Sequence, residues 1–199
     1  MSAYWTGVKA HAAAMRNRHA ILAVISLLAW AGAACAAPPP VAAEGADEGT
    51  EAFLEKATQN AMTEVALGKL AERNARSTGV NALGNRLARD HARMNTILGL
   101  ISQDKGLTVP KALDSEHRAI VEGLSSKTGA EFDVAYTALM VSDHANAIAL
   151  YSDAAEGGDL DLAAFAKSAL PALREQQRLA VSFQKMTAAY RLEAAAQRD

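Results

Sequence analysis

The chain has 199 residues, a net charge of −2 and a single cysteine, with 50% hydrophobic and 21% charged residues. This length and composition are typical of one globular domain and exclude a chain that is disordered throughout. One cysteine excludes an internal disulfide framework and any Cys-based zinc or iron–sulfur site, and the near-neutral charge argues against a nucleic-acid partner.

Residues 1–36 contain the three parts of a secretory signal peptide. Lys9, Arg16 and Arg18 form a basic leader, and the apolar run that follows, from Ala20 to Ala36, ends in small residues. The run is also at the lower limit of what spans a bilayer, so an N-terminal membrane anchor is the alternative. We expect cleavage and export to the periplasm.

The end of this segment fits two cleavage patterns. Ala34-Cys35-Ala36 has the A-x-A form of an ordinary signal-peptidase site. Gly32-Ala33-Ala34-Cys35 resembles a lipobox, in which the lipidated cysteine becomes the new N-terminus, although a good lipobox has leucine at the position of Gly32. We expect a soluble exported protein. The alternative is an outer-membrane lipoprotein, attached to the membrane through a lipidated Cys35.

The remainder of the chain is divided into a tether, a helical body and a short tail. Without residues 1–36 it has 17 Lys/Arg and 22 Asp/Glu, a net charge of −5. Residues 37–50 are rich in Pro, Ala and Gly and predict a flexible tether, residues 51–193 are dominated by strong helix formers, and residues 194–199 are a polar tail. Breakers divide the body into predicted helices over 51–76, 79–104, 113–125, 130–156 and 159–193. This pattern predicts an all-α, up-down four-helix bundle with a short additional helix in the connection between the second and third long helices.

The apolar face of each predicted long helix carries polar residues. Glu64 is central in the first, and His91 is central in the second, with Asp90 at the edge of that face. In the third, Asp143 is central and His144 is on the flank, and in the last, Gln176 and Gln177 straddle the stripe. Because an isolated buried carboxylate costs several kcal/mol, these groups must meet partners. Two arrangements are open: an interhelical hydrogen-bond network, or a metal site. The candidate ligands are Glu64, His91, Asp143 and His144, for one transition metal ion such as iron, zinc or copper.

Familiar catalytic patterns are missing from the sequence. There is no G-x-S-x-G, phosphate-binding glycine loop or dinucleotide fingerprint. Di-iron bundles use Glu-x-x-His on two helices, whereas the nearest pattern here is a single Asp114-x-x-His117 on the short helix. We expect His117, beside Glu116 and Arg118, to lie on the surface. The sequence therefore favours a protein without enzymatic activity.

The body resembles a bacterial family of exported proteins described as domain of unknown function 4142. The matching segments, in chain order, are EVALGKLA at 64–71, Asp90-His91, Gly129-x-x-Phe132-Asp133-x-x-Tyr136, MVSDH at 140–144, and Phe165-Ala166 followed by Leu170-Pro171. The resemblance covers about residues 51–185 and implies a ferritin-like bundle in the periplasm or outer membrane, with no established reaction. It also implies that Glu64, His91 and His144 belong to a family pattern, and many relatives carry histidine where this chain has Gln176.

Three functions are compatible with these observations. The first is a non-enzymatic exported bundle with a structural or stress-linked role. The second is a metal-binding or metal-dependent redox protein with its site between the helices, at Glu64, His91 and His144. The third and weakest is a homo-oligomer that binds hydrophobic ligands through an exposed face of the last helix.

Overall fold

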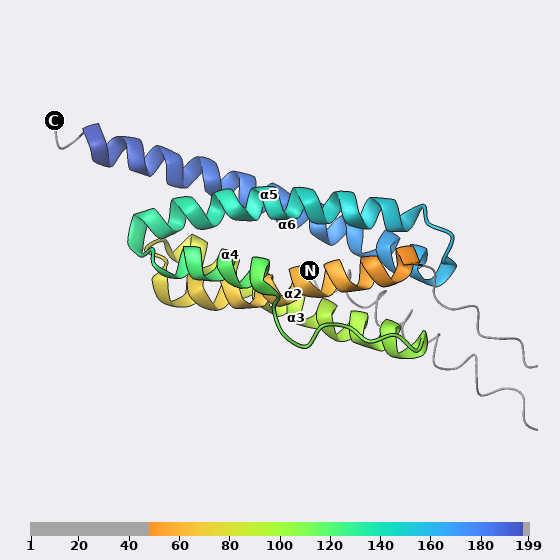
Figure 1. Ribbon diagram of the computed structural model, residues 1–199. Coiled ribbons are helices and arrows are strands. Elements are labelled where there is room, and N and C mark those ends of the chain that lie inside the picture. Colours follow the sequence, from red (N-terminus) through yellow and green to blue (C-terminus); the bar gives the residue numbers. More distant parts are fainter. Residues whose placement is uncertain (1–47, 197–199) are drawn as a thin grey trace, which may run out of the picture.

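The computed structural model describes residues 48–196, and this part of the chain forms five helices and no strand (Figure 1). They are α2 (Glu48–Asn74), α3 (Thr78–Asp104), α4 (Ser115–Ser125), α5 (Gly129–Ala155) and α6 (Leu160–Ala196). The predicted helices are confirmed, with every end within three residues. The predicted signal peptide, residues 37–47 of the tether and residues 197–199 of the tail lie outside the described residues. In the described part, the search for an apolar helix of membrane-spanning length found none.

Polar caps and glycines set the helix ends. The Ser77 hydroxyl accepts a hydrogen bond from the Val80 N–H at the start of α3, and Asp114 accepts one from the His117 N–H at the start of α4. Gly106 has a φ of 68° just after α3, in the left-handed region that glycine adopts without a steric penalty. Local sequence therefore accounts for the two ends of α3 and the start of α4.

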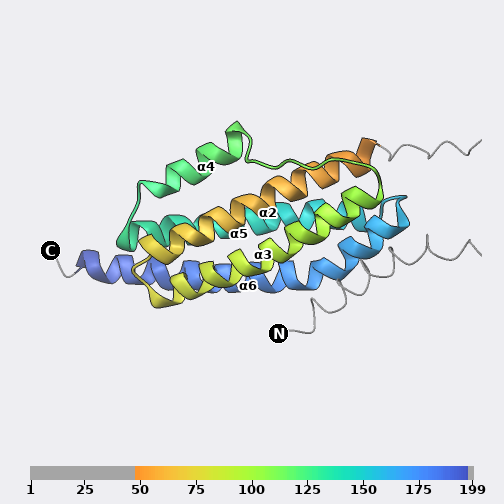
Figure 2. The same cartoon turned by 90° about the horizontal axis from the view of Figure 1, so that it is seen from below.

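Contacts between helix ends give the direction of each long helix. Lys105, after α3, pairs with Asp159, before α6, and the Thr50 hydroxyl at the start of α2 also bonds to Asp159. At the other end of the bundle, a backbone bridge joins Ala75, after α2, to Gly129, at the start of α5. Helices α3 and α5 therefore run in the same direction, and the connection between them returns along the bundle (Figure 2). The predicted up-down order holds within the α2–α3 and α5–α6 hairpins but not across this connection.

The long connection is held against α2. The Gln59 side chain donates to the Ala112 carbonyl at 3.2 Å and accepts from the Asp114 N–H at 3.2 Å. Near the end of α2, the Asn74 amide donates to the Lys127 carbonyl at 2.9 Å. These bonds satisfy backbone groups of a segment that forms few backbone hydrogen bonds within itself. They fix α4 along the outer side of α2 (Figure 2).

Two glycines let α2 and α3 approach closely. A Cβ on Gly68 would lie 2.5 Å from the Gly84 carbonyl oxygen and 2.6 Å from the Ala88 Cβ. A Cβ on Gly84 would lie 2.4 Å from the Ala71 Cβ and 3.3 Å from the Tyr136 hydroxyl. Real Cβ atoms do not fit at such distances, so the interhelical spacing depends on these two residues.

The apolar core consists of two clusters, one toward each end of the bundle. The first includes Phe53, Leu54, Ala57, Ala61, Met94, Leu98, Ala147, Tyr151, Phe165 and Leu173. The second includes Leu67, Ala71, Leu83, Leu87, Phe132, Tyr136, Met140 and Ala180. In each long helix the sequence passes from one cluster to the other across a short gap: 61–67 in α2, 87–94 in α3, 140–147 in α5 and 173–180 in α6. The side chains in these gaps form a layer at mid-height, which is hereafter called the central layer.

Candidate metal centre

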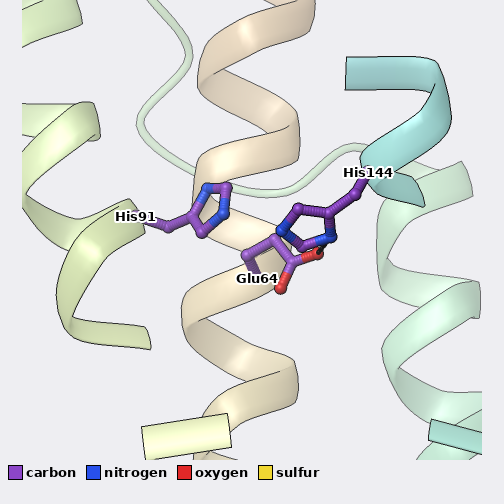
Figure 3. A group of neighbouring side chains, drawn as sticks. All are labelled: Glu64, His91 and His144. Atoms are coloured by element: carbon purple, nitrogen blue, oxygen red, sulfur yellow. Dashed lines mark ion pairs between the residues drawn. The ribbon is translucent and has the colours of Figure 1, made fainter. Parts of the chain in front are cut away.

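The central layer brings together a carboxylate and two imidazoles. Glu64 from α2, His91 from α3 and His144 from α5 are 0%, 1% and 1% exposed. Each offers one ligand atom, and the three atoms lie within 4.8 Å of one another. The side chains point toward one another from three helices (Figure 3). Because α2, α3 and α5 each have 27 residues and their ends are aligned, residues near their middles meet at one level.

The face of α5 that points inward differs from the prediction. His144, expected on the flank, is buried, whereas Asp143, expected in the centre, is half-buried at the edge. The buried stripe of α5 contains Phe132, Tyr136, Met140, His144, Ala147, Tyr151 and Ala155. Apolar residues surround most of this helix, so the sequence pattern did not select one face. Packing against α2 and α6 makes that selection.

Hydrogen bonding leaves most polar atoms of the cluster unpaired. His144 Nδ1 lies 2.9 Å from the Met140 carbonyl oxygen, which requires a proton on Nδ1. Among the described residues, His144 Nε2, both ring nitrogens of His91 and both carboxyl oxygens of Glu64 have no hydrogen-bond partner. His144 Nδ1 also lies 3.7 Å from Glu64 Oε1, beyond hydrogen-bond distance. Each buried unpaired group costs about 1–3 kcal/mol. Of the residues expected in an interhelical network, Gln176 donates to Asp90 and Asp143 accepts from Asn60, whereas Glu64 and His91 take no part in it.

Burial favours the neutral forms of all three groups. It lowers the pKa of His91 to about 3, with a further contribution from His144. Burial also lowers the pKa of His144, while the nearby Asp143 charge, the Met140 carbonyl and the Gln176 side chain act in the opposite direction. Burial raises the pKa of Glu64 well above its usual range, and the negative charge of Asp143 raises it further. The cluster therefore holds neutral imidazoles, whose lone pairs are free to act as ligands.

The other sequence-predicted residues lie outside this cluster. Asp143 accepts a hydrogen bond from the Asn60 amide at 2.7 Å at the edge of the bundle. His117 lies on α4, where its ring nitrogen is 2.8 Å from Asp114 Oδ1, and it is partly exposed, in line with its predicted surface position. Asp90 pairs with two arginines at the α3 surface.

Sequence reasoning missed one polar group near the cluster. Tyr136 belongs to the buried stripe of α5, and its ring lies in the core. Its hydroxyl is buried without a hydrogen-bond partner, and burial together with the charge of Glu64 raises the pKa of the phenol. Because tyrosine counts as apolar in a periodicity analysis, the sequence gives no signal for this buried hydroxyl.

Comparisons with known proteins place the chain in a family. Searches of curated proteins and of solved structures found no match. The family model described as domain of unknown function (DUF4142) matches residues 35–182, the greater part of the chain. These residues include the three members of the buried cluster and all four gaps between the apolar clusters. The chain belongs to the DUF4142 family.

Proposed function

We propose that this protein is a metal-binding helical bundle that holds a single transition metal ion between Glu64, His91 and His144. The observation that carries the proposal is the set of buried ligand atoms without partners, contributed by three helices to one small volume. A cation bound there would satisfy these atoms at once, whereas a network among the same side chains is not formed. The metal-binding function is therefore better supported than a purely structural role.

The donor set favours particular metals. Two imidazoles and one carboxylate suit zinc, iron and copper, and do not suit calcium or magnesium, which prefer oxygen ligands. The hydrogen bond from His144 Nδ1 to the Met140 carbonyl leaves Nε2 as the ligand atom, the arrangement that metal-binding histidines commonly have. Because Glu64, His91 and His144 are at most 1% exposed, a substrate has no direct access to them. Binding of the ion, rather than turnover of an external substrate, is the function that this burial supports.

The course of the chain supports a ferritin-like arrangement. Ferritin-like folds have one long crossover connection, and here a single connection, which contains α4, joins the parallel helices α3 and α5. They also build their metal sites from inward-facing side chains near the middle of the bundle. The present cluster differs from a di-iron site in having one carboxylate and two histidines.

Metal analysis tests the proposal directly. The protein is purified without chelator or a histidine tag, and its metal content is measured by mass spectrometry before and after addition of Zn²⁺, Fe²⁺ or Cu²⁺. We expect a single ion per chain, lost in His91→Ala and in His144→Ala, while His117→Ala, a histidine outside the cluster, retains it. Zn²⁺ at about 100 times its Kd should stabilise the wild type by about 2.7 kcal/mol. Absence of bound metal after reconstitution of a folded wild type would contradict the proposal.

Export is a second element of the proposed function, supported by the features of residues 1–36. Cell fractionation tests it, with periplasmic recovery of a shortened chain as the expected result. A Cys35→Ala substitution separates the two processing routes. A lipoprotein would lose its membrane association in this variant, whereas a soluble exported protein would keep its location.

A further inference from the structure

A fourth residue of the central layer comes from the one long helix that supplies none of the three ligands above. Gln176 lies in the 173–180 gap of α6, at the level at which the other long helices carry Glu64, His91 and His144. It is 1% exposed. Its side chain interacts with the His144 imidazole, so the amide lies beside that ring.

A surface carboxylate determines which end of the Gln176 amide faces inward. Gln176 Nε2 donates a hydrogen bond to Asp90 Oδ2 at 3.2 Å. Asp90 is in turn paired with Arg86 at 3.7 Å and with Arg93 at 3.4 Å. An ion-paired carboxylate accepts hydrogen bonds and donates none, so the amide nitrogen must face Asp90. The flipped amide would place two acceptor oxygens against each other, and the oxygen Oε1 is therefore turned away from Asp90.

The inward atom has no partner within the protein. Gln176 Oε1 is buried without a hydrogen bond, and so is Nε2 of the neighbouring His144. Because the His144 Nδ1 proton is donated to the Met140 carbonyl, Nε2 carries a lone pair. Two adjacent acceptors cannot satisfy each other by hydrogen bonding in this state. A cation bonds to both.

From this arrangement we infer that Gln176 Oε1 is a fourth ligand of the metal, so that each of the four long helices contributes one side chain. This inference rests on the proposed metal site. The resulting set of two imidazole nitrogens, one carboxylate oxygen and one amide oxygen is a four-coordinate environment of the kind that zinc adopts. Asp90 is a positioning residue: it holds the amide in the orientation that presents the oxygen to the ion.

Cobalt binding tests the inference, because Co²⁺ occupies zinc-type sites and its visible spectrum reports the ligand set. Purified wild type, Gln176→Leu and Gln176→His are titrated with Co²⁺, with Gln177→Leu as the control at the neighbouring, partly buried glutamine. Loss of the ligand in Gln176→Leu should weaken Co²⁺ binding by about tenfold or more and change the visible bands. Gln176→His should bind at least as tightly as the wild type, with bands shifted by the additional nitrogen. The control should match the wild type in affinity and spectrum.

The outcomes separate this inference from the proposal on which it rests. Wild-type affinity and an unchanged spectrum in Gln176→Leu would overturn the fourth ligand and leave the three-residue site intact. Failure of the folded wild type to bind Co²⁺, Zn²⁺, Fe²⁺ or Cu²⁺ would overturn both. Asp90→Asn is the second test, because an asparagine can donate to the glutamine oxygen and allow the amide to flip. It should weaken binding and alter the spectrum in the same sense as Gln176→Leu, and an unchanged spectrum would overturn the positioning role.

Discussion

Glu64 and His144 face each other in the interior of the bundle, with 3.7 Å between the carboxyl Oε1 and the imidazole Nδ1, and both are almost completely buried. Burial raises the pKa of Glu64 and lowers that of His144, so both neutral forms are favoured. The pair is therefore not an ordinary salt bridge. Because of these two residues and His91, the free energy of unfolding of the metal-free protein should fall both at acid pH and at alkaline pH.

The first prediction concerns the acid side. In the folded protein the pKa of His91 is about 3, below its unfolded value of 6.5, so the unfolded state binds more protons between these pH values. Stability should fall as pH decreases from 6.5 toward 3. In His91→Phe this contribution is absent, so its stability relative to the wild type should rise by about 1.4 kcal/mol per pH unit of acidification.

Urea unfolding of the metal-free proteins between pH 3.5 and pH 7 measures this difference, with chelator present throughout. His117→Phe, on the partly exposed α4 histidine, is the control. A constant difference in stability between His91→Phe and the wild type across this range would be incompatible with a buried neutral His91.

The second prediction concerns the alkaline side. The pKa of Glu64 is raised in the folded state, so above the unfolded value of 4.5 the folded protein binds the additional proton. The stability contributed by protonated Glu64 is complete below this pH and is lost as the pH rises. Glu64→Gln should therefore gain stability relative to the metal-free wild type by about 1.4 kcal/mol per pH unit, until the folded pKa is reached.

Unfolding at pH 5, 6, 7 and 8 tests this prediction, with Glu72→Gln, at an exposed position of α2, as the control. If Glu64→Gln showed the same pH dependence as the wild type, Glu64 would not be a buried protonated carboxyl in the metal-free protein. The same variant should bind the metal more weakly, because a neutral amide oxygen replaces the charged carboxylate.

The third prediction concerns the close approach of α2 and α3. Gly68→Ala would place a methyl group 2.5 Å from the Gly84 carbonyl oxygen, so the two helices must separate. We expect a loss of about 1–3 kcal/mol in the free energy of unfolding. Because Gly68 lies one helical turn after Glu64, metal affinity should fall as well.

Gly99→Ala is the matched control, since a Cβ at this helical position meets nothing within 4 Å. It should stabilise the protein by up to about 1 kcal/mol through helix propensity. Denaturant unfolding and Zn²⁺ titration measure both effects, and equal stability of the two variants would show that the interhelical spacing does not depend on Gly68.

The fourth prediction concerns a buried carboxylate away from the metal site. Asp133, near the start of α5 and 5% exposed, accepts hydrogen bonds from the backbone N–H groups of Arg76 at 3.1 Å and Ser77 at 2.8 Å. It ties the α2–α3 turn to α5. Asp133→Ala leaves both donors unpaired and should cost about 1–3 kcal/mol for each that stays buried, without affecting metal affinity.

Asp133→Asn keeps one acceptor oxygen and should be destabilised less than Asp133→Ala. Thermal unfolding and Zn²⁺ titration of the three proteins measure this order. A loss of less than about 0.5 kcal/mol in Asp133→Ala, the size of a change at an ordinary surface position, would show that the two bonds contribute nothing to stability.

Much of the candidate site could be predicted from the sequence. Helix formers interrupted by glycine and proline defined the five helices, and Glu64 and His91 each occur inside an apolar stripe of period 3.6. Polar residues in such stripes must find partners, which is a local argument that needs no tertiary structure. The periodicity argument reaches its limit at Asp143. Its helix is apolar around most of its circumference, so the pattern placed Asp143 at the centre of the apolar face, whereas His144 is the residue that enters the core.

By itself, then, the sequence predicted the helix boundaries to within three residues and the polar residues at mid-helix, among them Glu64, His91 and His144, because each depends on propensity or periodicity along one segment. Only the tertiary structure decided the direction of α5, the face that it presents, the spacing set by Gly68 and Gly84, and the burial of the Tyr136 hydroxyl without a partner. These features depend on the course of the α3–α5 connection and on contacts between segments far apart in the chain, which local periodicity does not encode.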